Sequence, residues 1–181
     1  MTRQKSPDSM ARLTGVVYLL YFLAAITAQL FFLDKVVLFI TINLIAYAFY
    51  MILALLFYYL FKPVNGSLSL VAALCGLCGC IVGILELFQI TLNYLGPLTF
   101  FGPYCILIGW LIFRSTFLPH ILGLLMMLAG ISWLAFLTPV GKKYLTSYIE
   151  VIGVLAEVSL MLWLIIKGVN PERWNEQAKK Q

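Results

Sequence analysis

The sequence predicts an all-α fold, a six-transmembrane-helix bundle with both the N-terminus and the C-terminus in the cytoplasm. Of the 181 residues, 63% are hydrophobic and only 10% are charged, whereas soluble domains are roughly 45–50% apolar and about 25% charged. The mean hydropathy is +1.01. In lipid the backbone must satisfy its own hydrogen bonds, which leaves helical bundles and closed barrels. The apolar segments are about 20 residues long and do not alternate, so they favour helices.

Six apolar segments give the predicted spans, and charged or helix-breaking residues separate them. The spans are 13–33, 36–61, 68–95, 98–113, 121–137 and 148–166. Their ends are marked in order by Asp34 with Lys35, Lys62 with Pro63, Gly96 with Pro97, Arg114, Pro139 with Gly141, and Lys167 with Gly168. The fourth span is the shortest and carries Gly102 and Pro103 near its start, so we expect this helix to be kinked or broken.

The basic residues predict the orientation of the bundle. With the N-terminus inside, the inner segments hold nine lysines and arginines and the outer segments hold three, namely Lys35, Lys142 and Lys143. This positive-inside bias predicts cytoplasmic termini and explains the net charge of +5 without nucleic acid. We interpret residues 1–181 as a single polytopic membrane domain. Its polar N-terminal segment 1–11 and polar C-terminal tail 172–181 are expected to be mobile or interfacial.

Polar side chains gather in the predicted outer half of the bundle. A charge at membrane depth costs roughly 2.5–3.5 kcal/mol on insertion scales, so an acid there usually faces protein or water. Glu157 lies in the middle of the sixth span and Glu86 lies within the third, and these two acids are the strongest candidates. The predicted ligand-binding residues are Glu157, Glu86, Gln89, Asn93, Asn43 and Gln29. The alternative is that these side chains only bond neighbouring helices together.

Helical phase places the two acids on faces rich in glycine. Gly76, Gly79, Gly83, Glu86 and Asn93 share one stripe of the third helix, with Gln89 on its flank. Glu150, Gly153 and Glu157 share a stripe of the sixth helix in the same way. Because small residues allow close helix packing, we expect both faces to turn to the bundle interior. They should close tightly on the inner side and open into a polar pocket on the outer side.

The cysteines and the histidine do not predict a metal or cofactor site. Cys75, Cys78 and Cys80 form a C-x-x-C-x-C run, but Cys78 and Cys80 point about 200° apart on a regular helix, so the three cannot share one metal. At membrane depth cysteine packs as a small apolar residue. His120 is the single histidine and lies in a short inner loop, where a basic residue near lipid phosphates is expected. We therefore predict no metal and no cofactor.

Three segments of the sequence resemble parts of a known family. Residues 112–123, IFRSTFLPHILG, resemble a signature of domain-of-unknown-function family 4386, with Thr116 and His120 where glycine and arginine are usual. Residues 157–169, EVSLMLWLIIKGV, are similar to the last helix of that family, and residues 11–18 are similar to its first helix. The resemblance implies six helices and the bacterial cytoplasmic membrane. It implies no activity, and it draws further attention to Glu157.

Three functions remain open at this point. The first is a non-enzymatic protein that binds or translocates a small ligand or lipid in an outward-opening polar pocket within the membrane. The second is an intramembrane enzyme that uses Glu86 and Glu157 as an acid–base pair, which ranks lower because no nucleophile or metal set is evident. The third is an accessory subunit of a larger membrane complex. The expected partners are membrane lipids, a small-molecule or lipid ligand, and an oligomer or partner subunit, but not nucleic acid.

Overall fold

All regular elements of the structure, a computed structural model that describes residues 6–90 and 96–180, are helices. Six apolar helices overlap the six predicted spans. They are α1 (Pro7–Phe31), α2 (Val36–Phe61), α3 (Gly66–Leu87), α4 (Pro97–Arg114), α5 (His120–Ala135) and α6 (Thr146–Ile166). A π-helical turn, η1 (Gly141–Leu145), leads into α6, and α7 (Pro171–Ala178) follows it. The all-helical prediction is confirmed.

Four of these helices have the length and composition needed to cross a membrane. They are α1, α2, α3 and the continuous segment formed by η1 and α6. The helices α4 and α5 are apolar but shorter, and at 1.5 Å per residue the 16 residues of α5 span about 24 Å. The six-span count and the sides of the termini therefore stay predictions.

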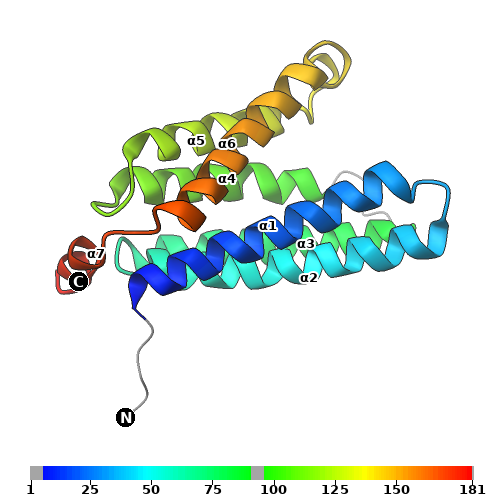
Figure 1. Cartoon of the computed structure of the whole chain (residues 1–181). Coiled ribbons are helices and arrows are strands. Elements are labelled where there is room, and N and C mark those ends of the chain that lie inside the picture. The colour runs from blue at the N-terminus through cyan, green and yellow to red at the C-terminus, as the bar shows by residue number, and fades with distance from the viewer. Residues whose placement is uncertain (1–5, 91–95, 181) are drawn as a thin grey trace.

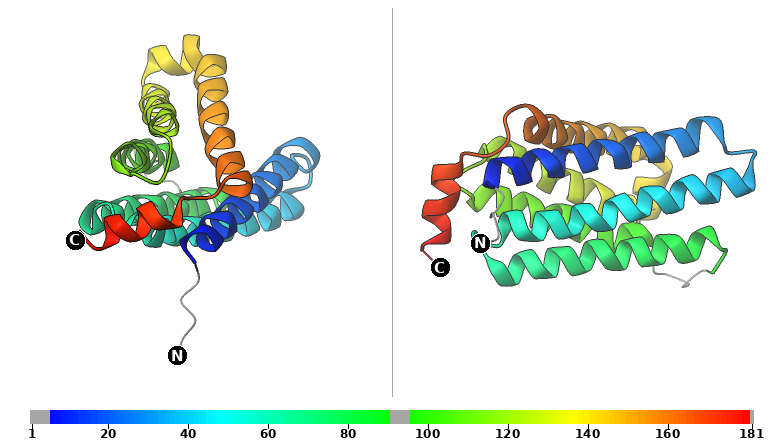
Figure 2. Two further views of the ribbon diagram at one scale, coloured as in Figure 1. Left: turned by 60° about the vertical axis from the view of Figure 1, so that its left-hand side comes forward. Right: turned by 60° about the horizontal axis from the view of Figure 1, so that its bottom comes forward.

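The six long helices form a ring in which each packs against the next one along the chain. The ring closes because α6 packs against α1. In Figure 1 the start of α1, the α4–α5 connection and α7 all lie at one end of the bundle, which we call the α7 end. Figures 1 and 2 both show the η1 end of α5 and α6 standing apart from the α1–α2 connection at the opposite end.

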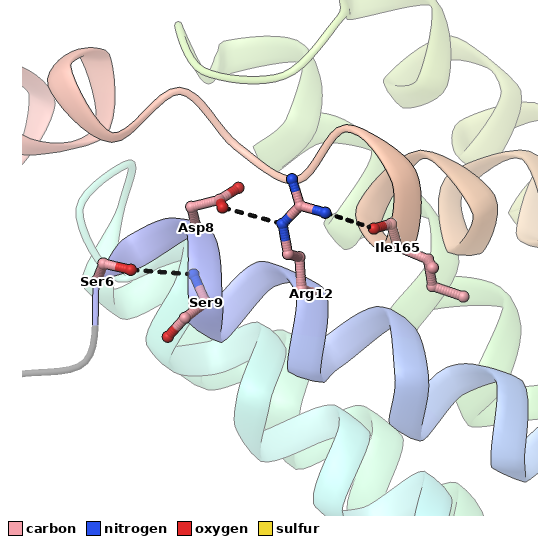
Figure 3. A network of polar contacts seen from close by, with 5 residues as sticks. All are labelled: Ser6, Asp8, Ser9, Arg12 and Ile165. Atoms are coloured by element: carbon pink, nitrogen blue, oxygen red, sulfur yellow. Dashed lines mark hydrogen bonds and ion pairs between the residues drawn. The ribbon is translucent and has the colours of Figure 1, made fainter.

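Polar contacts join α1 to α6 at the α7 end (Figure 3). Arg12 donates from Nε to Asp8 Oδ2 at 3.0 Å and from Nη1 to the carbonyl oxygen of Ile165 at 3.1 Å. The last carbonyls of a helix lack partners within that helix, so the guanidinium caps the C-terminus of α6. Gly168 has φ +65° and leaves no room for a side chain because the Asp8 carboxylate occupies that space. These polar contacts hold the end of α6 against the start of α1.

The N-terminal segment is helical from an earlier residue than the sequence predicts. Ser6 caps α1 by accepting a hydrogen bond from the backbone N–H of Ser9 at 3.3 Å, and Pro7 occupies the first helical turn. Residues 7–11, which we expected to be mobile or interfacial, are therefore part of α1.

The C-terminal segment is also helical, because residues 171–178 form α7, and its position at the membrane interface stays a prediction. Trp174 donates from Nε1 to the carbonyl oxygen of Leu60 at 2.9 Å. Gln177 accepts from the backbone N–H of Thr116 at 3.0 Å. These bonds dock α7 across the end of α2 and the α4–α5 connection. The polar composition of α7 did not predict these hydrogen bonds, because each one has a partner more than 50 residues away in the chain.

The third helix ends at Leu87, well before the predicted residue 95. Gln89 adopts φ +61°. Its N–H bonds to the carbonyl oxygen of Glu86 at 2.9 Å, and the N–H of Ile90 bonds to that of Leu85 at 3.0 Å. This pair of bonds is the Schellman motif that ends many helices, usually with glycine at the left-handed position. Because this position holds glutamine and not glycine, the sequence pattern did not indicate the end of the helix.

The fourth helix is continuous through Gly102 and Pro103, so the predicted alternative of a broken helix is wrong, and the kink stays a prediction. Helix α4 runs from Pro97 through Pro103 to Arg114. It is the partner of α5 in a tight pair, in which glycine faces glycine. A Cβ atom on Gly109 would lie 2.6 Å from the carbonyl oxygen of Gly123, and one on Gly130 would lie 2.6 Å from that of Gly102. We call Gly102, Gly109, Gly123 and Gly130 the glycine seam.

Candidate functional site

A cavity of about 490 Å³ lies inside the ring, in the half of the bundle opposite the α7 end. All six long helices contribute to its wall. The lining is mainly aromatic and aliphatic, and it includes Tyr21, Tyr47, Tyr50, Phe101 and Trp133. The exposed residues Ile26, Gln29 and Leu30 also line it, so the cavity reaches the surface beside the end of α1. A volume of this order is typical of small-molecule sites, which are about 300–1,000 Å³.

Among the described residues that line this cavity, Glu157 is the acidic one. It is 4% exposed and projects from the middle of α6. The hydroxyl of Tyr18 on α1 donates to Oε2 of Glu157 at 2.8 Å. Tyr18 itself is buried and stacks against Phe22 with ring centroids 5.3 Å apart. Tyr18 thus holds one carboxylate oxygen of Glu157 in a fixed position on the wall of the cavity.

Two further donors on the same wall have no hydrogen-bond partner in the described part of the chain. They are the hydroxyl of Tyr50 and the indole Nε1–H of Trp133, and both polar atoms are buried. The Trp133 ring packs on Gly153, one helical turn before Glu157, where an added Cβ would lie 2.9 Å from Nε1. A buried donor without a partner costs about 1–3 kcal/mol. The wall therefore offers an acceptor at Glu157 and two unused donors.

Glu86 does not join Glu157 on the cavity wall as the structure describes it. It lies exposed in the last turn of α3, and its Oε1 lies 3.5 Å from the position of a Cβ on Gly96, before α4. The expectation that both carboxyl groups share one interior space is not met. Its position in the last turn of α3 leaves this acid at the surface. The acid–base pair that an enzyme would need is not assembled in the described cavity.

The glycine-containing faces of α3 and α6 meet the cavity, but they do not pack on each other. Helix α3 packs against α2 and α4, whereas α6 packs against α1 and α5. Gly76 and Gly79 line the cavity from α3, and Glu157 lines it from α6. The expected polar pocket is instead a mainly apolar cavity with a few polar groups.

The other predicted ligand-binding residues lie in different surroundings. Gln29 is exposed but lines the cavity near its surface opening. Asn43 is buried and donates from Nδ2 to the carbonyl oxygen of Phe39 within its own helix, at 2.8 Å. Gln89 is exposed after the end of α3, and Asn93 lies outside the described residues. Of the six, the structure brings Glu157 and Gln29 to the cavity.

The four cysteines are free thiols, with Cys80 and Cys105 buried, Cys75 half-buried and Cys78 exposed. Only Cys80 lines the cavity. In the described residues no group of three or more potential metal ligands comes together. The prediction that the cysteines serve packing stays open.

Sequence reasoning missed Tyr18, Tyr50 and Trp133. The signal for Tyr18 was present, since a buried acid in a membrane helix needs a donor and tyrosine is the commonest donor in this sequence's apolar spans. The chain has ten tyrosines, however, and only the packing of α1 on α6 selects Tyr18 as the partner. The same holds for Tyr50 and Trp133, which come from two other helices.

Comparison with known proteins agrees with the resemblance seen in the sequence. No curated protein matches this chain, and no solved structure matches it. The model of one family, described as Domain of unknown function (DUF4386), matches residues 85–168. The matched region includes residues 112–123 and the helix that carries Glu157, whereas residues 11–18 lie outside it. The predicted family is thus confirmed over residues 85–168, and that family, DUF4386, is one of unknown function.

Proposed function

We propose that this protein crosses the bacterial cytoplasmic membrane six times, with both termini inside, and binds a small, mainly apolar molecule in the cavity around Glu157. The observation that carries the binding proposal is a buried carboxyl group, held by Tyr18, on the wall of an otherwise aromatic cavity. A carboxylate in such surroundings needs a reason beyond packing, because intramembrane acids mark ligand and ion paths. The opening beside Ile26 and Leu30 suits entry from lipid.

The polar groups of the wall favour a ligand that carries a hydroxyl group. Glu157 accepts a hydrogen bond, whereas Tyr50 and Trp133 can each donate one. A hydroxyl both donates and accepts, so it can satisfy the acid and one of the unused donors together. An ammonium group has only donors, so it cannot accept a hydrogen bond from the indole N–H of Trp133. The proposed ligand is therefore an apolar alcohol of lipid-like or polycyclic character.

The direct test measures the binding of matched probes to the purified protein in nanodiscs, by thermal shift and equilibrium dialysis. The probes are 1-adamantanol, 1-aminoadamantane and 1-methyladamantane, which share one apolar cage. We expect 1-adamantanol to bind about tenfold more tightly than 1-methyladamantane, because the latter leaves buried polar groups unpaired. Tighter binding of 1-aminoadamantane would show that the site prefers a cation to an alcohol. No binding of any probe would refute the cavity as a site.

Two alanine variants control for the location of the probe. Ala25 lines the cavity on α1, whereas Ala48 is exposed on α2 and does not line it. Ala25→Phe should abolish binding because the phenyl ring fills the cavity, and Ala48→Phe should bind like the parent protein. Equal effects of the two variants would show that the probes partition into lipid or bind elsewhere.

The topology is tested by labelling single cysteines in a variant without the four natural ones. Cysteines at Lys35 and Lys142 should react with an impermeant reagent from outside, and those at Lys62 and Lys179 only after the inner face is opened. The reason is the bias of nine basic residues against three. The opposite labelling pattern would refute the orientation, and labelling of all four from one side would refute the six crossings.

A further inference from the structure

A second site at the α7 end has a different character from the cavity around Glu157. It is a groove of about 590 Å³ between α7 and the α4–α5 connection. Its basic residues are Arg114, Arg173 and Lys180, together with His120, and Glu176 is its acidic residue. We call it the basic groove. Three basic residues and one acidic residue give the groove a net charge of +2 when His120 is counted as neutral.

Within residues 6–90 and 96–180, no ion pair neutralises the basic residues of the groove. The ion pair found in the described residues joins Arg12 to Asp8 on α1, and neither residue lines the groove. Arg114, Arg173 and Lys180 form none there, and the carboxylate of Glu176 pairs with none of them. Unpaired cations converging on one groove favour an anionic ligand.

Hydrogen-bond donors in the groove are held in place by the fold. Arg173 donates from Nη1 to the carbonyl oxygen of Thr116 at 3.3 Å, which fixes its guanidinium beside the α4–α5 connection. His120 Nδ1 lies 2.7 Å from the carbonyl oxygen of Phe113, so Nδ1 donates and Nε2 is left for another partner. The guanidinium of Arg114 lies over the Trp110 ring, 5.3 Å from its centroid. Such fixed arginines are suited to phosphate oxygens.

The basic groove borders on exposed apolar surface. Trp110 lies one turn before Arg114 on the same face of α4 and is 43% exposed. On α5, Ile121 is 59% exposed and Leu124 is 43% exposed, directly after His120. A ligand whose anionic head enters the groove could thus extend hydrocarbon chains along α4 and α5. A free phosphate ion would leave this apolar surface unused.

We propose that the basic groove binds the phosphate headgroup of an anionic phospholipid whose acyl chains lie along α4 and α5. This lipid site is independent of the cavity around Glu157, because the two lie toward opposite ends of the bundle and share no lining residue. It does not require the proposed alcohol ligand.

The experiment measures lipid binding to the full chain in a neutral detergent, by native mass spectrometry and thermal shift. The probes are dioctanoyl phosphatidylglycerol, dioctanoyl phosphatidylcholine and glycerol phosphate at equal concentrations. The phosphatidylglycerol should bind and raise the melting temperature, whereas the other two should not. Equal binding of phosphatidylcholine would show that the basic residues do not select an anionic headgroup. Equal binding of glycerol phosphate would make this a site for a soluble anion, and either result overturns the proposal.

Matched charge variants locate the binding. Arg114→Gln with Lys180→Gln removes two cations of the groove whose side chains make no hydrogen bond in the described residues, so α7 should stay docked. Binding of phosphatidylglycerol should weaken about 30-fold, at about fivefold for each basic residue near an anionic headgroup. Lys142→Gln with Lys143→Gln removes the same charge at the other end and should change binding less than about twofold.

Two outcomes of the variant series would contradict the site. Equal weakening by both double variants would show a general effect of net charge and overturn the proposal. If the groove double variant does not fold, Lys180→Gln alone replaces it, with about fivefold weaker binding expected. Unchanged binding in that single variant likewise overturns the proposal.

Discussion

The glycine seam between α4 and α5 and the glycine face of α3 use the same residue with opposite results. In the seam, each glycine faces the backbone of another glycine at the same height, and an added Cβ on Gly109 would lie 2.6 Å from the Gly123 carbonyl oxygen. On α3, an added Cβ on Gly79 would meet the Phe100 side chain at 3.3 Å, and Gly79 lines the cavity. The seam brings two helix backbones into contact, whereas Gly76 and Gly79 on α3 face side chains and line the cavity.

The difference follows from what stands opposite each glycine. Small residues allow close approach only where both helices carry them at the same level. Gly109 and Gly123 meet this condition, and so do Gly102 and Gly130. Gly76 instead faces the side chains of Ala54 and Tyr104, each 3.2 Å from an added Cβ. A stripe of small residues on a single helix therefore predicts either a tight contact or a cavity, and the partner decides between them.

The largest effect is expected from a large side chain in the seam. Gly109→Leu forces the backbones of α4 and α5 apart and should cost about 3 kcal/mol or more, because overpacking a close contact cannot be relieved by a rotamer change. We expect little monodisperse protein by size-exclusion chromatography in detergent and a strongly lowered melting temperature. Gly66→Leu is the control, since an added Cβ there meets only Cγ of Lys62 at 3.9 Å. A Gly109→Leu protein as stable as the parent would show that α4 and α5 are not in close contact.

A smaller effect is expected at the wall of the cavity, where Tyr18 donates to Glu157. A double-mutant cycle of Tyr18→Phe and Glu157→Leu should give a coupling energy of about 0.6–1.7 kcal/mol, as for other side-chain hydrogen bonds within membranes. The measurement is the free energy of unfolding in detergent by a denaturant titration. Tyr18→Phe with Gln29→Leu is the control pair, because Gln29 does not contact Tyr18 by a hydrogen bond, and its coupling should be about zero. A zero coupling in the first cycle would refute the bond between α1 and α6.

The smallest effect on stability is expected from the α3 face. Gly79→Ala should change the free energy of unfolding by less than about 1 kcal/mol, because the Phe100 side chain must yield only slightly and alanine favours the helix. The same variant narrows the cavity and should weaken the binding of 1-adamantanol. Gly109→Ala, the same substitution in the seam, should cost about 1–3 kcal/mol. Equal losses of stability in the two variants would remove the distinction between the two glycine surfaces.

Several elements of this protein could be predicted from the sequence because they depend on local composition. Long apolar runs bounded by charged residues, proline or glycine gave the six helices, with ends that agree to a few residues at Val36, Phe61, Arg114 and Ile166. The end of α3 was wrong because Gln89 adopts a backbone conformation usually taken by glycine. The docking of α7 was missed because its polar pattern is the same for a free tail and for a segment bonded to distant carbonyls.

The candidate site, like the fold, could be predicted from the sequence only in part. The sequence by itself determined that Glu157 lies at the middle of an apolar helix, where an acid must face protein or water. The sequence ranked Glu157 above Glu86 but predicted an interior position for both, since both acids lie on stripes that contain glycine. Only the tertiary structure decided that Glu157 meets Tyr18 and the cavity while Glu86 lies at the exposed end of α3. Helical phase gives the direction of a side chain on its own helix, and the arrangement of the other five helices fixes what that side chain meets.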